Sequence, residues 1–325
     1  MPRKKGKPGK KISAVICTYN RYPLMEKAID SCLDQSLNED DYEVIIVDNS
    51  PPSPDMEVYR ERYEDHPVVR YIVESIPGLS NARNVATREA DSPYVAFLDD
   101  DAIASHGWLE GVLTAFERFG DKVGVVGGRI DPIWETGRPS WVSDKLLGHF
   151  SVVNWGGECR IAKKDEWFAG ANVSFRKSAL EAVGGFDVSL GRTGGGAVLL
   201  SNEETAVSDK IQELGYQLVY APEARVDHLV ESKRTEQSWV RRRMSWQAVS
   251  DFIKMPSMFL EDRKGLWGVV SEYYSHMKPE HRTLVGLSVD VDDPELFMQQ
   301  VNANYCMTAL LLMGGYFPDF DHEGS

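Results

Sequence analysis

The first hundred residues alternate between strand-like and helix-like segments, and this alternation restricts the fold more than any other feature of the sequence. Short apolar runs rich in β-branched residues predict strands at 11–18, 42–47, 68–73 and 94–98. Apolar residues at helical spacing, or charged surface stretches, predict helices at 24–35, 56–65 and 79–90. Such an order implies an α/β fold, in which helices cover a parallel sheet through right-handed crossovers.

Three of the predicted strands end in polar clusters, at 18–21, 48–50 and 99–101. In open α/β sheets, ligands bind at the carboxyl ends of the strands. The sequence therefore predicts that these clusters share one cleft of nucleotide size.

The acidic cluster contains Asp99, Asp100 and Asp101 directly after an apolar strand. Their mutual repulsion would be relieved by a hard divalent cation such as Mg²⁺ or Mn²⁺, which prefers carboxylate oxygens. A solvated acidic turn is an equally weighted alternative. Asp48 could accept hydrogen bonds from a base or ribose, or could cap a turn. Arg83 could bind phosphate, although an ordinary salt bridge is favoured when it is considered alone.

The second half of the chain offers two further candidates. Glu203 and Glu204 follow a glycine-rich loop and begin a helix, which suits either a general base or a favourable charge at a helix N-terminus. His228 follows a strand and could bind a metal or phosphate, although a structural histidine is the commoner case. The glycines at 194–196 match no P-loop or dinucleotide fingerprint, which argues against ATPases and dehydrogenases.

Composition excludes several protein classes. The net charge is −14, although residues 1–11 hold six basic residues and no acid. A body this acidic argues against nucleic-acid binding, and the basic tail is interpreted as a solvated, disordered arm rather than a contact for an anionic membrane. The four cysteines form no disulfide or zinc pattern, which favours a reducing cytoplasm. No apolar stretch reaches the roughly 18 to 20 residues that cross a bilayer, and no secretory signal is expected.

Several segments together resemble a family 2 glycosyltransferase of the GT-A fold. They lie in the order and at the spacing of that family, at 12–21, 42–50, 78–86, 94–102, 168–187, 202–216 and 221–229. The resemblance implies a Rossmann-like, mostly parallel sheet flanked by helices, with a helical C-terminal extension. The expected organisation is a tail (1–11), a catalytic domain (12–235) and the extension (236–325). The catalytic domain would comprise a nucleotide-binding half (about 12–105) and an acceptor half (about 106–235).

The resemblance also implies roles for individual residues. Those expected to contact the nucleotide are Thr18, Tyr19, Arg21, Asp48, Arg83, Asp99 and Asp100. Asp101 would be the main metal ligand, with Asp99 and His228 beside it. Gly170, Ala171 and Asn172 would border the donor sugar and acceptor. Glu204 stands where the family usually has a catalytic aspartate, so the base is expected to be Glu204, or Glu203 takes part.

The implied activity is metal-dependent, inverting transfer of a sugar from a UDP-, dTDP- or GDP-linked donor to a hydroxyl group. The acceptor would be a glycan, a lipid-linked sugar or a small molecule, in polysaccharide, glycoconjugate or glycosylated-metabolite biosynthesis. Two alternatives stay open: a sugar nucleotidyltransferase, and a non-catalytic nucleotide- or carbohydrate-binding module. The enzyme is expected in the cytoplasm, with peripheral contact at the inner membrane face as an option. A helix over 294–313 would pack on the catalytic domain or in a homodimer, and the arginines at 241–243 would either meet the acceptor or pack between helices.

Overall fold

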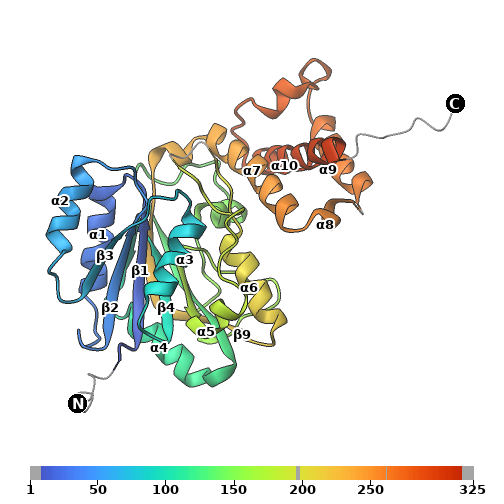
Figure 1. Cartoon of the computed structure of the whole chain (residues 1–325). Coiled ribbons are helices and arrows are strands. Elements are labelled where there is room, and N and C mark those ends of the chain that lie inside the picture. The colour runs from blue at the N-terminus through green and yellow to red at the C-terminus, as the bar shows by residue number, and fades with distance from the viewer. Residues whose placement is uncertain (1–8, 195–197, 261, 317–325) are drawn as a thin grey trace, which may run out of the picture. The chain divides into compact units, whose positions relative to one another are not determined.

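The computed structural model describes residues 9–194, 198–260 and 262–316, so most of the predicted basic tail lies outside the described residues. The chain forms two compact units, drawn in Figure 1. The first comprises Met1–Ile133, Ser151–Ala197 and Glu203–Leu229, and the second Trp134–Phe150, Val198–Asn202 and Val230–Ser325. The second unit therefore includes two internal segments of the predicted catalytic domain and also its last residues, 230–235.

A mixed sheet forms the centre of the first unit. Its strands are β1 (Ile12–Thr18), β2 (Tyr42–Asp48), β3 (Val69–Val73), β4 (Tyr94–Asp99), β5 (Ala102–Ala104), β6 (Val123–Trp134), β7 (Arg160–Ile161), β8 (Asn172–Arg176) and β9 (Gln217–Val230). The order is β3-β2-β1-β4-β8-β6-β9-β5, with β7 paired to β9. The run β3-β2-β1-β4 is parallel, whereas β8 joins β4 and β6 antiparallel, and β5 and β7 join β9 antiparallel. The α/β class is confirmed, and the parallel character is restricted to the part that the alternating pattern covered.

The helices of the first unit are α1 (Tyr22–Leu33), α2 (Pro54–Tyr63), α3 (Leu79–Glu89), α4 (Trp108–Phe119), α5 (Lys177–Ala182) and α6 (Glu203–Glu213), with a 3₁₀ turn η1 (Gly120–Lys122). Those of the second are α7 (Gln237–Lys254), α8 (Pro256–Leu260), α9 (Arg263–Ser275) and α10 (Pro294–Tyr316), with 3₁₀ turns η2 (Asp144–Phe150), η3 (Ser232–Thr235), η4 (Pro279–His281) and η5 (Leu284–Leu287). Among the described helices, none combines the length and the apolar content that crossing a membrane requires.

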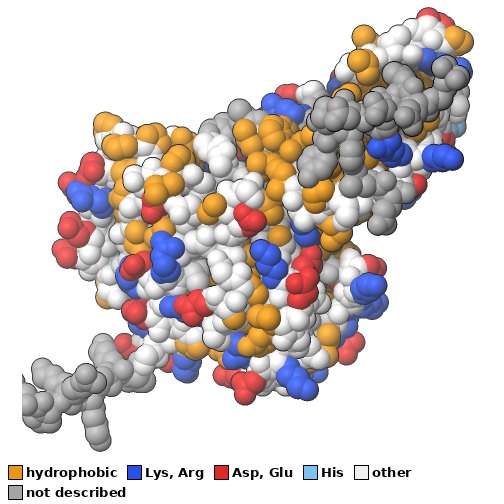
Figure 2. Space-filling view, turned by 45° about the vertical axis from the view of Figure 1, so that its right-hand side comes forward, with side chains coloured by type: hydrophobic (Ala, Val, Ile, Leu, Met, Phe, Trp, Pro, Cys, Tyr) orange, Lys and Arg blue, Asp and Glu red, His pale blue; other side chains and the backbone are white. Residues whose placement is uncertain are grey.

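The two faces of the sheet bury separate apolar layers. Side chains alternate along a strand, so Ile16 of β1 joins one layer and its neighbour Val15 joins the other. Trp108 of α4 packs in the first layer, whereas Ala82 of α3 and Val207 of α6 pack in the second. Helices α1, α2 and α4 therefore cover one face, and α3, α5 and α6 cover the other (Figure 1). On the face drawn in Figure 2, acidic and basic side chains are interspersed, so the acidic excess is not gathered into one patch there.

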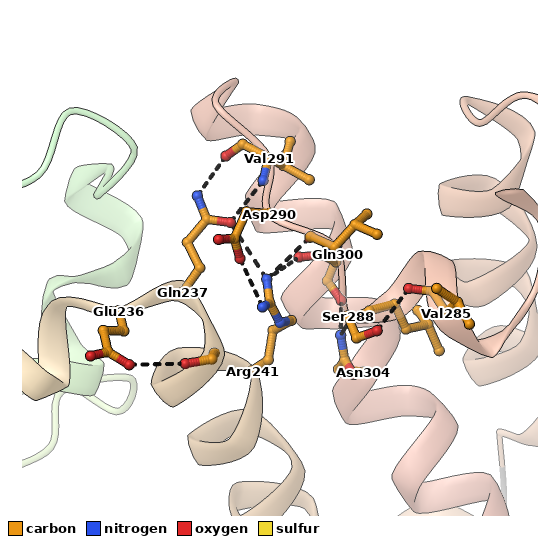
Figure 3. Close-up of polar contacts among 12 residues, drawn as sticks. Glu236, Gln237, Arg241, Val285, Ser288, Asp290, Val291, Gln300 and Asn304 are labelled. Carbon is orange, nitrogen blue, oxygen red and sulfur yellow. Dashed lines mark hydrogen bonds and ion pairs between the residues drawn. The ribbon is translucent and has the colours of Figure 1, made fainter.

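A buried polar network joins the helices of the second unit. The Arg241 guanidinium donates to the carbonyl of Val289 (3.1 Å) and to Oε1 of Gln300 (3.3 Å), and forms an ion pair with Asp290 (2.9 Å). Gln237 exchanges hydrogen bonds with the backbone of Val291, as Figure 3 shows. Arg241 thus has the packing role that was the alternative to acceptor contact.

Candidate active site

Strand register brings the predicted polar clusters to one edge of the sheet. In the parallel ladder, Thr18 pairs with Asp48 and Cys17 pairs with Asp99, so β1, β2 and β4 end at the same level. His228 reaches this edge through β9, where it pairs with Ala102 of β5. The carboxyl ends of these strands therefore form the expected ligand-binding edge.

Asp99, Asp101 and His228 form a group that could hold a metal ion. One ligand atom from each lies within 4.8 Å of the other two, and His228 Nε2 is 3.2 Å from Oδ1 of Asp101. The other imidazole nitrogen, Nδ1, is buried and has no hydrogen-bond partner. Two carboxylates and one imidazole are donors that suit Mn²⁺ and, through the carboxylates, Mg²⁺. These residues therefore fit the cation that the sequence predicts.

Asp100 is not a member of this group and is anchored by other residues. Its Oδ2 accepts a hydrogen bond from Thr18 Oγ1 (2.8 Å), and its Oδ1 lies 2.9 Å from Nη1 of Arg21. Burial raises the pKa of Asp100 to about 7, although Arg21 opposes the shift. Asp100 thus links the ends of β1 and β4 to the beginning of α1.

Arg83 of α3 contacts two carboxylates, those of Glu203 and Asp99. Its guanidinium bonds Oε1 of Glu203 (2.7 Å) and lies 3.3 Å from Oδ1 of Asp99. It also stacks at 5.7 Å over the ring of Phe97, and its side chain is only 3% exposed. A Cβ atom at position 170 would stand 2.5 Å from Nη2 of Arg83, so any larger residue there would have to displace this guanidinium from its present position.

The two adjacent glutamates have different surroundings. Glu203 is committed to Arg83, whereas Oε1 of Glu204 accepts a hydrogen bond from the backbone N–H of Gly170 (3.2 Å). The second oxygen of Glu204 is buried and without a hydrogen-bond partner. Burial, and next the charge of Glu203, raise the pKa of Glu204 to about 7. Glu204 thus combines a carboxylate outside the ion pair with a pKa near neutrality.

The other predicted nucleotide contacts lie differently. Asp48 is completely buried, and its oxygens accept hydrogen bonds from the hydroxyls of Tyr22 and Tyr71 and from the Ser50 N–H. Because Asp48 is completely buried, contact with a base or ribose would require its surroundings to open, and that role stays a prediction. Tyr19 is half-buried, and its hydroxyl lies beside Gly194.

Asn172, one of the residues predicted to border the sugar, uses its side-chain amide in three hydrogen bonds within the protein. Its Oδ1 accepts the indole N–H of Trp108 (2.9 Å), and its Nδ2 donates to the carbonyls of Ala224 (2.7 Å) and Arg129 (3.1 Å). This use fills both donors of the amide. Ala171 beside it is 1% exposed, so Gly170 is the member of this trio that contacts the glutamate and arginine cluster.

Sequence reasoning missed the residues that hold α3 in place. Ser80 donates its hydroxyl proton to the carbonyl of Leu190 (2.7 Å), and the side chain of Asn84 bonds both the N–H and the carbonyl of Phe186 (2.8 Å each). These polar residues are four apart on the helix that carries Arg83. Their helical spacing is a signal that could have indicated a shared contact surface.

Carboxylates and an imidazole therefore gather at the carboxyl ends of the strands, where open α/β sheets bind their ligands. A family model described as "Glycosyl transferase family 2" matches residues 13–184. The glucosyl-dolichyl phosphate glucuronosyltransferase of Haloferax volcanii is 30% identical over 244 residues, covering 74% of this chain and 76% of that protein. The chain therefore belongs to family 2 of the glycosyltransferases, and it transfers glycosyl groups from a nucleotide sugar. Inversion is typical of this family.

Two further similarities agree with this membership. The validoxylamine A glucosyltransferase of Streptomyces hygroscopicus subsp. limoneus is 28% identical over 207 residues, 57% of this chain but only 45% of that protein. A mannosyltransferase from Pyrobaculum calidifontis, solved with GDP-Man and Mn²⁺, superposes with a TM-score of 0.59 at 18% identity, covering 95% of this chain and 88% of that one. This last similarity supports the fold, and the predicted GT-A architecture is confirmed.

Proposed function

We propose that this chain is a metal-dependent, inverting glycosyltransferase in which Glu204 is the catalytic base. The observation that carries the proposal is that the acidic side chains of the site have different partners. Asp99 and Asp101 converge with His228, and Glu203 is tied to Arg83. Glu204 is left with a carboxylate outside any ion pair in the described residues.

Asp99, Asp101 and His228 would hold a Mg²⁺ or Mn²⁺ ion, which supplies positive charge against the diphosphate of the donor. Arg83 neutralises Glu203 and part of Asp99, and thereby holds both carboxylates in fixed positions. The backbone N–H of Gly170 orients Glu204 through Oε1. A base with a pKa near 7 suits proton transfer at neutral pH.

The reaction is a single displacement. The acceptor hydroxyl oxygen forms a bond to the anomeric carbon while the bond from that carbon to the diphosphate oxygen breaks. The hydroxyl proton passes to Glu204, and the nucleoside diphosphate leaves with the bonding electron pair. Attack opposite the leaving group inverts the anomeric centre, and alignment of the two oxygens provides much of the acceleration.

The donor class is a UDP-, dTDP- or GDP-linked sugar, and the acceptor bears a hydroxyl group. The Haloferax relative, whose name specifies glucosyl-dolichyl phosphate, supports a lipid-linked sugar as the first acceptor class to assay. Such a substrate would place a cytoplasmic enzyme at the inner face of the membrane. The validoxylamine A enzyme supports a small-molecule acceptor as the second class.

The test separates donor binding from chemistry. Thermal shifts with UDP, dTDP and GDP, each with and without Mn²⁺, identify the nucleobase of the donor. The matching nucleotide sugars are then assayed for release of the nucleoside diphosphate. We expect Glu204→Gln to retain the Mn²⁺-dependent thermal shift but lose about 10²- to 10⁴-fold in kcat. Glu213→Gln, an exposed position on the same helix, is the control. Full activity of Glu204→Gln would remove Glu204 from the mechanism.

A further inference from the structure

Arg21 spans two members of the acidic triplet. Its Nη1 lies 2.9 Å from Oδ1 of Asp100, and its Nη2 lies 3.0 Å from Oδ2 of Asp101. The two carboxylates are 8% and 5% exposed, whereas the arginine side chain is 28% exposed. The guanidinium therefore places positive charge on the acids from the solvent side of the cluster.

The carboxylates of Asp100 and Asp101 differ in their other partners and in whether they are candidate ligands of the cation. Asp100 is held by Thr18 on its other oxygen and is not one of the convergent donors. Asp101 is one of these donors, and its two oxygens face His228 and Arg21. A cation bound to Asp101 and the guanidinium of Arg21 repel each other at such separations.

Arg83 also lies near one of the convergent donors, 3.3 Å from Oδ1 of Asp99, but other groups of the protein hold its guanidinium. It is 3% exposed, bonds Glu203 at 2.7 Å, donates to the carbonyl of Gly170 at 3.3 Å and lies over Phe97. Its charge is fixed in the protein whether or not a cation is present. Arg21, at the beginning of α1, is more exposed than Arg83, at 28%, and bridges two members of the triplet.

We propose that Arg21 is an internal counterion that competes with the divalent cation for Asp101 and thereby sets the cation affinity of the nucleotide-free enzyme. The inference rests on the cation site of the proposed function. When the cation binds, Nη2 of Arg21 leaves Asp101 while Nη1 keeps Asp100 as its anchor. The released N–H groups then donate to the diphosphate, so Arg21 couples nucleotide binding to cation binding.

The experiment measures Mn²⁺ binding by the full chain, by electron paramagnetic resonance of free Mn²⁺, first alone and then with saturating UDP or GDP. Without nucleotide, Arg21→Gln should bind Mn²⁺ roughly tenfold more tightly than the wild type, because one opposing charge is removed. Arg21→Lys should lie between them, since one ammonium cannot bridge both carboxylates. Arg60→Gln removes a charge from a half-exposed pair with Glu57 on α2 and should match the wild type.

Nucleotide supplies the second readout. The diphosphate that binds should raise the Mn²⁺ affinity of the wild type more than that of Arg21→Gln, which lacks the donors that couple the two ligands. Mn²⁺ binding that is present in the wild type and absent from Asp101→Asn would confirm the cation site independently. If that site exists and Arg21→Gln binds Mn²⁺ no more tightly than the wild type, the counterion role is wrong although the proposed function stands. If Arg21→Gln does not fold, the same criterion applies to Arg21→Lys. Absence of Asp101-dependent binding in the wild type would overturn the cation site and the counterion role together.

Discussion

Replacing Arg83 with methionine removes the charge that neutralises Glu203 inside the first unit. Glu203 is 5% exposed, its Oε1 bonds Arg83 at 2.7 Å, and its Oε2 has no hydrogen-bond partner. Methionine fills much of the arginine volume, so the loss is chiefly electrostatic. Breaking a buried ion pair by removing one member costs about 3 to 5 kcal/mol. The contact with the Phe97 ring adds about 0.5 to 2 kcal/mol.

The assay is urea unfolding at neutral pH with EDTA, followed by circular dichroism and tryptophan fluorescence. We expect Arg83→Met to reduce the free energy of unfolding by about 3.5 to 7 kcal/mol, the sum of the two contributions. In the double variant with Glu203→Gln, much of this loss should be recovered, because no buried charge is left without a partner. Arg88→Met, at an exposed position on the same helix, should stay within about 0.5 kcal/mol of the wild type. A loss below about 1 kcal/mol for Arg83→Met, or strict additivity in the double variant, would refute the argument from the buried pair.

Three further predictions follow from the polar interior. With EDTA, stability should fall as pH rises from about 4.5 to about 7.5, because over this range folded Asp100 and Glu204, with pKa values raised to about 7, hold protons that the unfolded chain has already lost. Asp100→Asn should flatten this slope in urea midpoints, and an unchanged or steeper slope would contradict the assignment. Asn172→Asp should cost about 2 to 5 kcal/mol at neutral pH, because a carboxylate would face two carbonyl oxygens, and thermal unfolding within 1 °C of the wild type would argue against this. Arg241→Met should cost about 1 to 2 kcal/mol in urea unfolding, less than Arg83→Met, because the Asp290 side chain left behind is 79% exposed. A loss equal to or larger than that of Arg83→Met would show that exposure of the remaining partner does not decide the cost.

Much of the first unit could be predicted from local pattern. The helix expected at 79–90 is α3 (Leu79–Glu89), and the strand expected at 68–73 is β3 (Val69–Val73). Buried parallel strands are continuous apolar runs, and in the crossover helices apolar residues recur about every 3.6 positions. Both signals are therefore local in the sequence. The antiparallel strands β8, β6 and β9 pair over long sequence separations, so no local pattern specifies their order in the sheet.

The chemistry divides in the same way. The sequence by itself determined that Asp99 and Asp101 follow a buried strand and that two glutamates begin a helix, because a strand end and a helix start are local features. Only the tertiary structure decided that Arg83 neutralises Glu203, that Arg21 bridges Asp100 and Asp101, and that Asp48 is enclosed by tyrosines. These pairings join residues 23 to 120 positions apart in the chain. Hydrogen bonds and charges act over a few ångströms, so the partner of a buried ionisable group is fixed by the packing of the sheet and its helices.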